Sequence, residues 1–231
     1  MIVAVIPARG GSKRIPKKNI KEFFGKPIIA WSINAALNSK CFDKVVVSTD
    51  DDEIAQTAID YGAEVPFVRP DYLSDDQTGT IAVLRHAINW FLQNGFTPNI
   101  VCCIYATAPF IRSSNLVKAY KEFVEKENIC FLFSATSYEY PIQRAFKIDG
   151  DGYASMFNPG SFNMRSQDLE EAYHDAAQFY FGKTKIWLER NNIFEGSRPY
   201  ILPSWQVQDI DTEEDWIRAE LMFQNKKNNS Q

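Results

Sequence analysis

A glycine-containing, strongly basic segment near the start of the chain is the clearest candidate for chemistry. It reads PARGGSKRIPKKN from Pro7, and five Lys and Arg side chains surround its two adjacent glycines. Adjacent glycines let backbone N–H groups approach an anion closely, while Arg9, Lys13 and Lys18 can neutralise a triphosphate. The segment fits neither the GxxxxGK[ST] pattern of P-loop ATPases nor the GxGxxG pattern of dinucleotide dehydrogenases. We therefore predict a phosphate-binding loop of another kind, the alternative being a solvated basic turn.

Two aspartates near the other end of the chain are spaced to bind one cation. Asp209 and Asp211 stand at i and i+2, and side chains at this spacing point to the same side of an extended backbone. Mg²⁺ takes oxygen ligands and usually keeps waters and substrate phosphates, so two carboxylates suffice. A metal held there would shield an α-phosphate and orient an attacking hydroxyl. Equally, Asp211 or Thr212 could cap the last helix and leave Asp209 solvated.

Three other polar residues are weaker candidates. Asp50 follows an apolar run and could either face the site or cap the next helix. His86 falls within a predicted helix and is expected to be structural. His174 falls in a predicted loop and could reach a substrate. Neither histidine has the spacing of a metal ligand.

Short apolar runs alternate with helical periodicity over the first 135 residues, which predicts an α/β domain with a mostly parallel, Rossmann-like sheet flanked by helices. The expected strands are 2–6, 45–48, 65–68, 100–105 and 130–136. Helices are expected after Pro27, from Asp51 to Gly62, from Thr80 to Asn94 and after Ser113. Open sheets of this kind bind ligands beyond the carboxyl ends of their strands, and the basic segment follows the first strand directly.

The pattern changes after residue 136. Residues 145–157 alternate around Asp-Gly-Asp-Gly, which predicts a β-hairpin, and residues 158–175 are polar and irregular, as in a surface loop. Regular structure is expected again at 178–182, in a helix at 184–191 and in a final helix from Thr212, before a frayed tail at 225–231. We therefore predict one domain over residues 1–231 with an inserted arm and loop at about 138–176.

Composition excludes several classes of protein. The 231 residues are 45% hydrophobic with a net charge of -4, which fits a folded globular chain and not a general nucleic-acid binder. No run approaches the roughly 20 apolar residues that a membrane span requires, and the first residues lack a signal-peptide pattern. Four cysteines show no disulfide-type or metal-type spacing. We expect a cytoplasmic protein with reduced cysteines.

Several segments together resemble the acylneuraminate cytidylyltransferases, the family that makes CMP-activated sialic acids. The resemblance covers nearly the whole chain and rests on Ala8-Arg9-Gly10-Gly11-Ser12-Lys13 with Lys18-Asn19, Val47-Ser48-Thr49-Asp50, Arg69-Pro70, Leu73-Ser74-Asp75, Thr107-Ala108-Pro109 and Asp209-Ile210-Asp211-Thr212. It implies a nucleotide-diphospho-sugar transferase fold, CTP as nucleotide and Mg²⁺ as cofactor. It also implies a homodimer in which each arm closes the partner's site.

The resemblance also implies roles for individual residues. Catalytic roles fall to Arg9, Lys18, Asp209 and Asp211, the two aspartates being the metal ligands. Nucleotide binding falls to Ala8, Arg9, Gly10, Gly11, Ser12, Lys13, Asn19, Arg69, Thr78 and Thr80. The implied reaction is attack of the anomeric C2 hydroxyl of a nonulosonic acid on the α-phosphate of CTP, with pyrophosphate leaving.

The sequence departs from the common sialic-acid pattern where the sugar would bind. Tyr105 stands where a glutamine is usual before the Thr-x-Pro motif, and YHDAAQFY at 173–180 replaces an Arg-x-Asn-Gly type segment. This variant looks like the pseudaminic acid branch, which serves surface or flagellar glycosylation. Tyr105, Gln178 and Tyr180 are then expected to select the sugar, and Arg165 and His174 to bind its carboxylate. The alternatives are a sialic or legionaminic acid enzyme, a non-catalytic nucleotide-binding module, or an adaptor that dimerises through the arm.

Overall fold

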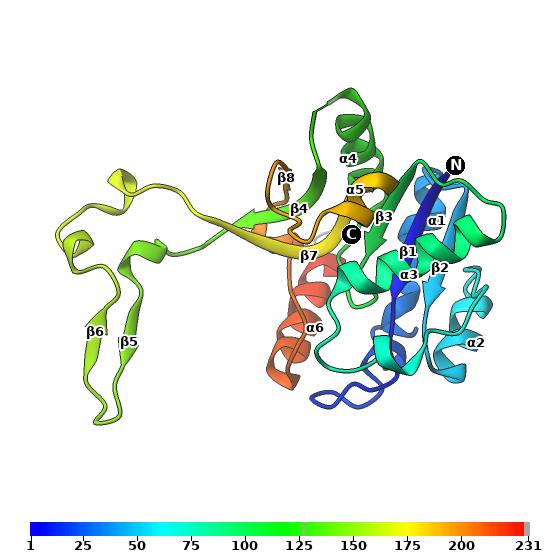
Figure 1. Ribbon diagram of the computed structural model, residues 1–231. Helices are drawn as coiled ribbons and strands as arrows, with labels where there is room; N and C mark the ends of the chain where they lie inside the picture. Colours follow the sequence, from blue (N-terminus) through cyan, green and yellow to red (C-terminus); the bar gives the residue numbers. More distant parts are fainter. Residues whose placement is uncertain (127, 229–231) are drawn as a thin grey trace.

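A six-stranded mixed sheet forms the centre of the computed structural model, which describes residues 1–126 and 128–228 (Figure 1). Its strands are β1 (Ile2–Pro7), β2 (Lys44–Ser48), β3 (Ile100–Ile104), β4 (Phe131–Ser137), β7 (Tyr173–Lys183) and β8 (Arg198–Ile201). The spatial order is β2-β1-β3-β7-β4-β8, in which β7 alone runs antiparallel to its neighbours. The predicted α/β fold with a mostly parallel sheet is confirmed.

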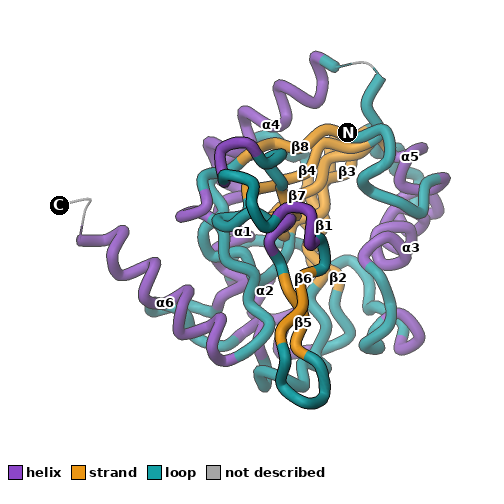
Figure 2. The backbone as a smooth tube through the Cα atoms, turned by 90° about the vertical axis from the view of Figure 1, so that its left-hand side faces the viewer, coloured by secondary structure: helices purple, strands orange, loops and turns teal. Residues whose placement is uncertain are grey.

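Helices cover both faces of this sheet because its strands are apolar on both sides. The longer helices are α1 (Ile28–Ser39), α2 (Asp52–Asp60), α3 (Thr80–Gln93), α4 (Ser113–Glu125), α5 (Thr184–Glu189) and α6 (Glu213–Asn228). In β1, Ala4 and Ile6 pack towards α1, α2 and α4, whereas Val3 and Val5 pack towards α3 and α5. Figure 2 shows the two groups of helices on opposite sides of the strands. Short 3-10 helices are η1 (Lys18–Ile20), η2 (Asp71–Leu73), η3 (Ile142–Arg144), η4 (Pro159–Ser161), η5 (Ser166–Asp168) and η6 (Ser204–Gln206).

A third apolar cluster joins the two ends of the chain. Ile15, from the basic segment, and Ile210, between the paired aspartates, are both fully buried in it. Aromatic rings from α6 and from the loop before α1 complete the cluster, among them Trp216, Phe223 and Phe23. Burial of such side chains is worth about 1.5–3 kcal/mol each. Hydrophobic packing therefore brings a cationic and an anionic stretch together, although they lie almost 200 residues apart.

The predicted hairpin is present as an arm that protrudes from the sheet (Figure 1). Strands β5 (Phe146–Ile148) and β6 (Ala154–Met156) pair antiparallel, with Phe146 opposite Met156. The Asp149 carboxylate accepts hydrogen bonds from the backbone N–H groups of Asp151 and Tyr153, which closes the turn.

The structure differs from the expected elements in four places. The expected strand at 65–68 is reduced to isolated bridges of Glu64 with Val46 and of Val68 with Thr49, because Pro66 cannot donate to a ladder. Strand β8 was not predicted, since it is short, exposed and contains Pro199. Strand β7 begins at Tyr173 and shortens the predicted loop. The expected frayed tail is helical to residue 228, and residues 229–231 lie outside the described part. None of the described helices is long and apolar enough to cross a membrane.

Candidate functional site

A cavity of about 470 Å³ opens at the carboxyl ends of β1 and β3, where the fold predicts a ligand. It is lined by Pro7, Arg9, Ser12, Lys13, Arg14, Lys18, Asn19, Arg69, Asp76, Thr78, Thr80, Val83, Tyr105, Ala106, Thr107 and Asp211. This lining includes most residues expected to bind the nucleotide. Ala8, Gly10 and Gly11 belong to the same loop but do not line the cavity. Five cations against two carboxylates leave the lining positive, as a triphosphate requires.

Hydrogen bonds at its ends shape the basic loop. Its first amide, from Ala8, donates to Ser48 O at 2.9 Å, and the Asn19 side chain donates to Arg9 O at 2.9 Å. The N–H of Gly10 donates to the Asp50 carboxylate at 3.0 Å. Asp50 thus holds the loop, whereas Asp51 caps α2 by accepting from the N–H of its third residue.

Arg69 supports the floor of the cavity. It is buried, and its guanidinium donates to the Ser48 hydroxyl at 3.1 Å and to the Ser48 carbonyl. Burial lowers the pKa of Arg69 to about 10, while nearby Asp50 raises it. The side chain therefore keeps its charge at neutral pH and adds a fixed cation beneath the loop.

The basic loop and the acidic segment meet directly. Lys18 Nζ donates to the Ile210 carbonyl at 2.6 Å and lies 3.3 Å from Asp211 Oδ1, and Arg14 Nη2 lies 2.9 Å from the same oxygen. The two stretches therefore share one cleft.

Asp209 and Asp211 face the same side of the backbone, as their spacing predicted. Ile210 between them points into the core, and both aspartates line a second cavity. The cap of α6 is made by Thr212 and Asp215, because the Asp215 N–H donates to the Thr212 hydroxyl at 3.2 Å and the Thr212 N–H returns a bond to Asp215 at 2.9 Å. The capping alternative thus applies to Thr212, while the Asp211 carboxylate remains on the cavity wall.

The aspartate pair has the character of a cation site. Asp209 is an exposed residue on the wall of the second cavity, and partial desolvation of its carboxylate, followed by the negative charge of Asp211, raises the pKa of Asp209. Two carboxylates that repel each other across a cavity fit a divalent ion that takes its other ligands from water and phosphate. Within residues 1–126 and 128–228, no cluster of three or more His, Cys, Asp or Glu forms a complete metal cage.

The second cavity, of about 960 Å³, adjoins the first at Asp211, which lines both. Its wall combines aromatic and polar residues from the base of the arm, η6 and α6, including Tyr138, Tyr140, His174, Trp205 and Arg218. The ring of His174 packs against Tyr138 at 4.7 Å. This cavity therefore has room and chemistry for a polar ligand beside a ligand in the first cavity.

The other predicted sugar-binding residues are dispersed. Tyr105 lines the first cavity, and Tyr180 lies buried beneath it. Gln178 is buried, lines neither cavity, and donates to the Gln206 carbonyl at 2.6 Å. Arg165 lies on the arm, where it pairs with Asp168 at 3.5 Å. Outside both cavities, His86 packs edge-on against Phe67 at 5.0 Å, as a structural residue would.

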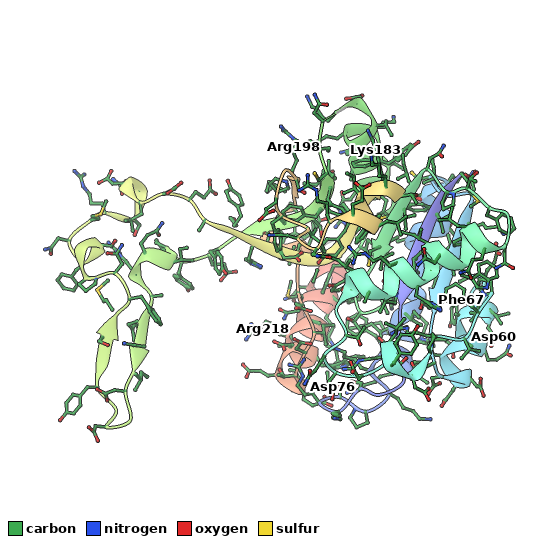
Figure 3. All side chains as sticks on the ribbon, in the orientation of Figure 1. Asp60, Phe67, Asp76, Lys183, Arg198 and Arg218 are labelled. Carbon is green, nitrogen blue, oxygen red and sulfur yellow. The ribbon has the colours of Figure 1, made fainter. Side chains whose placement is uncertain are left out.

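Asp76, which was not among the residues predicted from the sequence, is labelled in Figure 3 beside the N-terminal loop. Its carboxylate lies 2.6 Å from Arg9 Nη1 and 2.5 Å from Lys13 Nζ. Neighbouring Asp75 instead closes a turn by accepting from the N–H and hydroxyl of Thr78. In the sequence, the adjacent aspartates Asp75 and Asp76 are the feature that could have indicated this role, but only the fold shows which of the two faces Arg9 and Lys13.

Comparison with known proteins agrees with this geometry. A pseudaminic acid cytidylyltransferase of Campylobacter jejuni subsp. jejuni serotype O:2 is 48% identical over 96% of this chain and 95% of its own length. A CMP-N,N'-diacetyllegionaminic acid synthase of Legionella pneumophila is 32% identical over 96% of both. A structure of CMP:2-keto-3-deoxy-manno-octonic acid synthetase complexed with CTP has the same fold, with a TM-score of 0.72 at 16% identity, over 97% of this chain and 99% of that one. Residues 3–226 match the cytidylyltransferase family, to which this chain therefore belongs.

Proposed function

We propose that this protein transfers CMP from CTP to the anomeric C2 hydroxyl of pseudaminic acid and releases pyrophosphate. The observation that best supports this proposal is the contact of Lys18 with Asp211. Asp211 lines both cavities, so this contact joins the basic first cavity to the second cavity, which contains the paired aspartates. In the reaction the sugar oxygen bonds to the α-phosphorus of CTP, the bond from that phosphorus to the bridging oxygen breaks, and the hydroxyl loses its proton.

The first cavity would bind the triphosphate. Arg9, Lys13, Arg14 and Lys18 neutralise phosphate charge there, and charge stabilisation with positioning is the main need of phosphoryl transfer. Asp209 and Asp211 would hold Mg²⁺, which stabilises negative charge on the phosphates when bound.

The second cavity would hold the sugar. Its aromatic side chains suit a sugar that carries acylamino groups in place of some hydroxyls and has no oxygen on its terminal carbon. Pseudaminic acid is such a sugar, and the 48% identical relative is named for it. Pyrophosphate release measured separately with pseudaminic, legionaminic and N-acetylneuraminic acid tests this assignment. The highest kcat/KM is expected with pseudaminic acid, and a clear preference for either of the others would replace it.

The metal role can be tested apart from the fold. Asp209→Asn and Asp211→Asn are expected to nearly abolish turnover and to weaken Mn²⁺ binding measured by electron paramagnetic resonance with CTP present. Glu214→Gln removes a carboxylate from the exposed side of α6 and serves as the matched control. Unchanged Mn²⁺ binding in both aspartate variants would contradict the role. CTP binding by the wild type without turnover on any of the three sugars would favour the non-catalytic module.

We further propose a homodimer assembled through the arm. The hairpin exposes large apolar side chains, with Ile148 67% and Phe157 69% accessible, and such clusters mark interaction surfaces. Arg165 on the arm would then act in the partner's site. Ile148→Asp is expected to yield monomers by light scattering and to lose activity, while Lys147→Glu on the same strand is the charge control. A dimeric Ile148→Asp protein would contradict this interface.

We also propose that the enzyme is cytoplasmic. All four cysteines are free thiols, as expected in a reducing compartment. Cell fractionation tests this placement, and recovery of the protein from an extracytoplasmic fraction would contradict it.

A further inference from the structure

The second cavity carries an excess of negative charge. Four of its lining residues are carboxylic acids, namely Glu139, Asp209, Asp211 and Asp215. Arg218 is the only Lys or Arg among the described residues that line it. The sugar proposed for this cavity is itself an acid, whose carboxylate is bonded to the anomeric carbon C2. A further negative charge enters such a cavity at a large cost in free energy unless a cation meets it.

Helix α6 directs Arg218 towards this cavity. Asp215, Arg218 and Met222 follow one another at spacings of three and four residues, which places them on one face of the helix, and all three line the cavity. The neighbouring face, with Trp216 and Phe223, is buried in the third apolar cluster and fixes the rotation of the helix. Figure 3 shows Arg218 projecting from α6 on the side of the arm, whose base also lines the cavity.

The contact that Arg218 makes within its helix is weak and replaceable. Its Nη2 donates to Glu214 Oε1 at 3.3 Å across one helical turn, and the two side chains are 58% and 84% accessible. Exposed pairs of this kind shift an equilibrium by only about 1.5- to 5-fold. A guanidinium carries its N–H donors in a planar fork that matches a carboxylate, so the carboxylate of a ligand can take two parallel bonds from it.

The two basic residues that the sequence suggested for the carboxylate fit it less well. His174 Nδ1 lies 2.9 Å from the Asp175 carbonyl oxygen, which can only accept, so Nδ1 carries a proton. In its neutral form His174 therefore has an acceptor as its other ring nitrogen, which a carboxylate cannot use. Arg165 lies on the arm, pairs with Asp168 and lines neither cavity.

We propose that Arg218 binds the carboxylate of the sugar and thereby orients its C2 hydroxyl for attack. This inference rests on the proposed function and adds to it a residue that selects acidic sugars. Because the carboxylate carbon is bonded to C2, two parallel bonds from a guanidinium fix the direction of the neighbouring hydroxyl as well as holding the sugar. A neutral sugar of the same shape forgoes these bonds and is the poorer substrate.

The test compares the acid with a neutral copy of itself. Among pseudaminic, legionaminic and N-acetylneuraminic acid, the sugar with the highest kcat/KM is used together with its C1 amide, which keeps the shape of the carboxylate and removes its charge. The wild type should prefer the acid. Arg218→Gln should lower kcat/KM for the acid by about 5- to 50-fold and change it little for the amide, whereas a general defect in structure would lower both alike. Arg218→Lys keeps the charge without the fork and should lie between the two.

Lys185→Gln is the matched control. Lys185 pairs with Glu189 at 3.9 Å in α5, again across one helical turn, and lines neither of the two cavities. The substitution therefore removes the same charge and the same kind of pair away from the site, and the preference for the acid should stay unchanged. Arg165→Gln tests the arginine of the arm, and the preference should persist there as well.

Three results would overturn the inference. The first is a wild type that uses the amide as well as the acid. The second is an undiminished preference for the acid in Arg218→Gln, which would leave the carboxylate to the proposed metal ion, to His174 or to Arg165. The third is an equal loss of preference in Lys185→Gln, which would show an effect of overall charge. Failure of the proposed function would appear differently, as absence of pyrophosphate release by the wild type with all three acids, and the inference would fall with it.

Discussion

Asp76 forms ion pairs with Arg9 and Lys13, two cations that we propose bind the triphosphate, so removal of its charge should strengthen nucleotide binding. Hydrogen bonds from Lys13 and Arg9 lower the pKa of Asp76, which keeps it ionised at neutral pH. One carboxylate therefore bridges two loop cations at 2.6 and 2.5 Å. Phosphate oxygens must displace it before they reach those cations. Asp76→Asn keeps the shape of the side chain and removes the competing charge.

The expected magnitude follows from the exposure of these groups. The Lys13 side chain is 82% accessible and that of Asp76 42%, so each ion pair is well screened by water. An exposed pair shifts an equilibrium by about 1.5- to 5-fold, and loss of two should lower the dissociation constant of CTP by about 2- to 25-fold. Calorimetric titration with CTP at low ionic strength measures this change. The gain should shrink as KCl is added, because salt screens exposed charges.

Asp71→Asn provides the matched control. It removes the same charge from the same connection, in η2, and Asp71 makes no ion pair within the described residues. An equal gain in both variants would mean that overall charge, and not the bridge, controls affinity. Weaker CTP binding by Asp76→Asn would refute the reasoning outright, because the carboxylate would then be holding the loop in its binding conformation.

Three further changes test the site and its frame. Measured without metal, Asp209→Asn should raise the melting temperature at neutral pH, because the raised pKa of Asp209 means that its charged form destabilises the fold. The gain in melting temperature should vanish as the pH falls below the ordinary aspartate pKa. A lowered melting temperature at neutral pH would contradict this reasoning. Lys40→Gly should stabilise the protein by about 0.5–1 kcal/mol in urea unfolding, since Lys40 ends α1 at a φ of 54°, and no gain would count against strain there. Gly10→Ala should weaken CTP binding, because its Cβ would lie 2.7 Å from Asp51 Oδ2; unchanged affinity would show that the loop adapts.

The elements that depend on local pattern were predictable, and those that depend on distant pairing were not. The strand at 100–104 and the helix from Thr80 follow from continuous apolar runs and periodicity. Strand β8 carries no such pattern, because it lies at the sheet edge and only its pairing with β4 defines it. The antiparallel direction of β7 likewise depends on where the long arm returns the chain to the sheet.

Site residues show the same division. The spacing of Asp209 and Asp211 predicted that they face one side, and Ile210 between them confirms the alternation. Spacing could not show that Gln178 is buried, because the bulge at Ala177 changes the alternation of β7. Here the register of β4 and β7 shifts between Phe133 and Ala135, and the hydroxyl of Ser134 in β4 accepts from the N–H groups of Gln178 and Phe179. The order of residues in β7 alone does not reveal this contact.

Contacts of Asp211 connect the two halves of the site. Lys18 and Arg14 are engaged by Asp211, so this carboxylate is already satisfied by cations of the chain itself. Phosphates that draw these two cations away leave Asp211 beside Asp209 with its negative charge unbalanced. If the pair holds a divalent ion as proposed, we expect its affinity for that ion to rise then, since a cation is bound most strongly where carboxylate charge is least compensated. We therefore expect the proposed nucleotide binding and metal binding to be coupled through Asp211, the residue that lines both cavities.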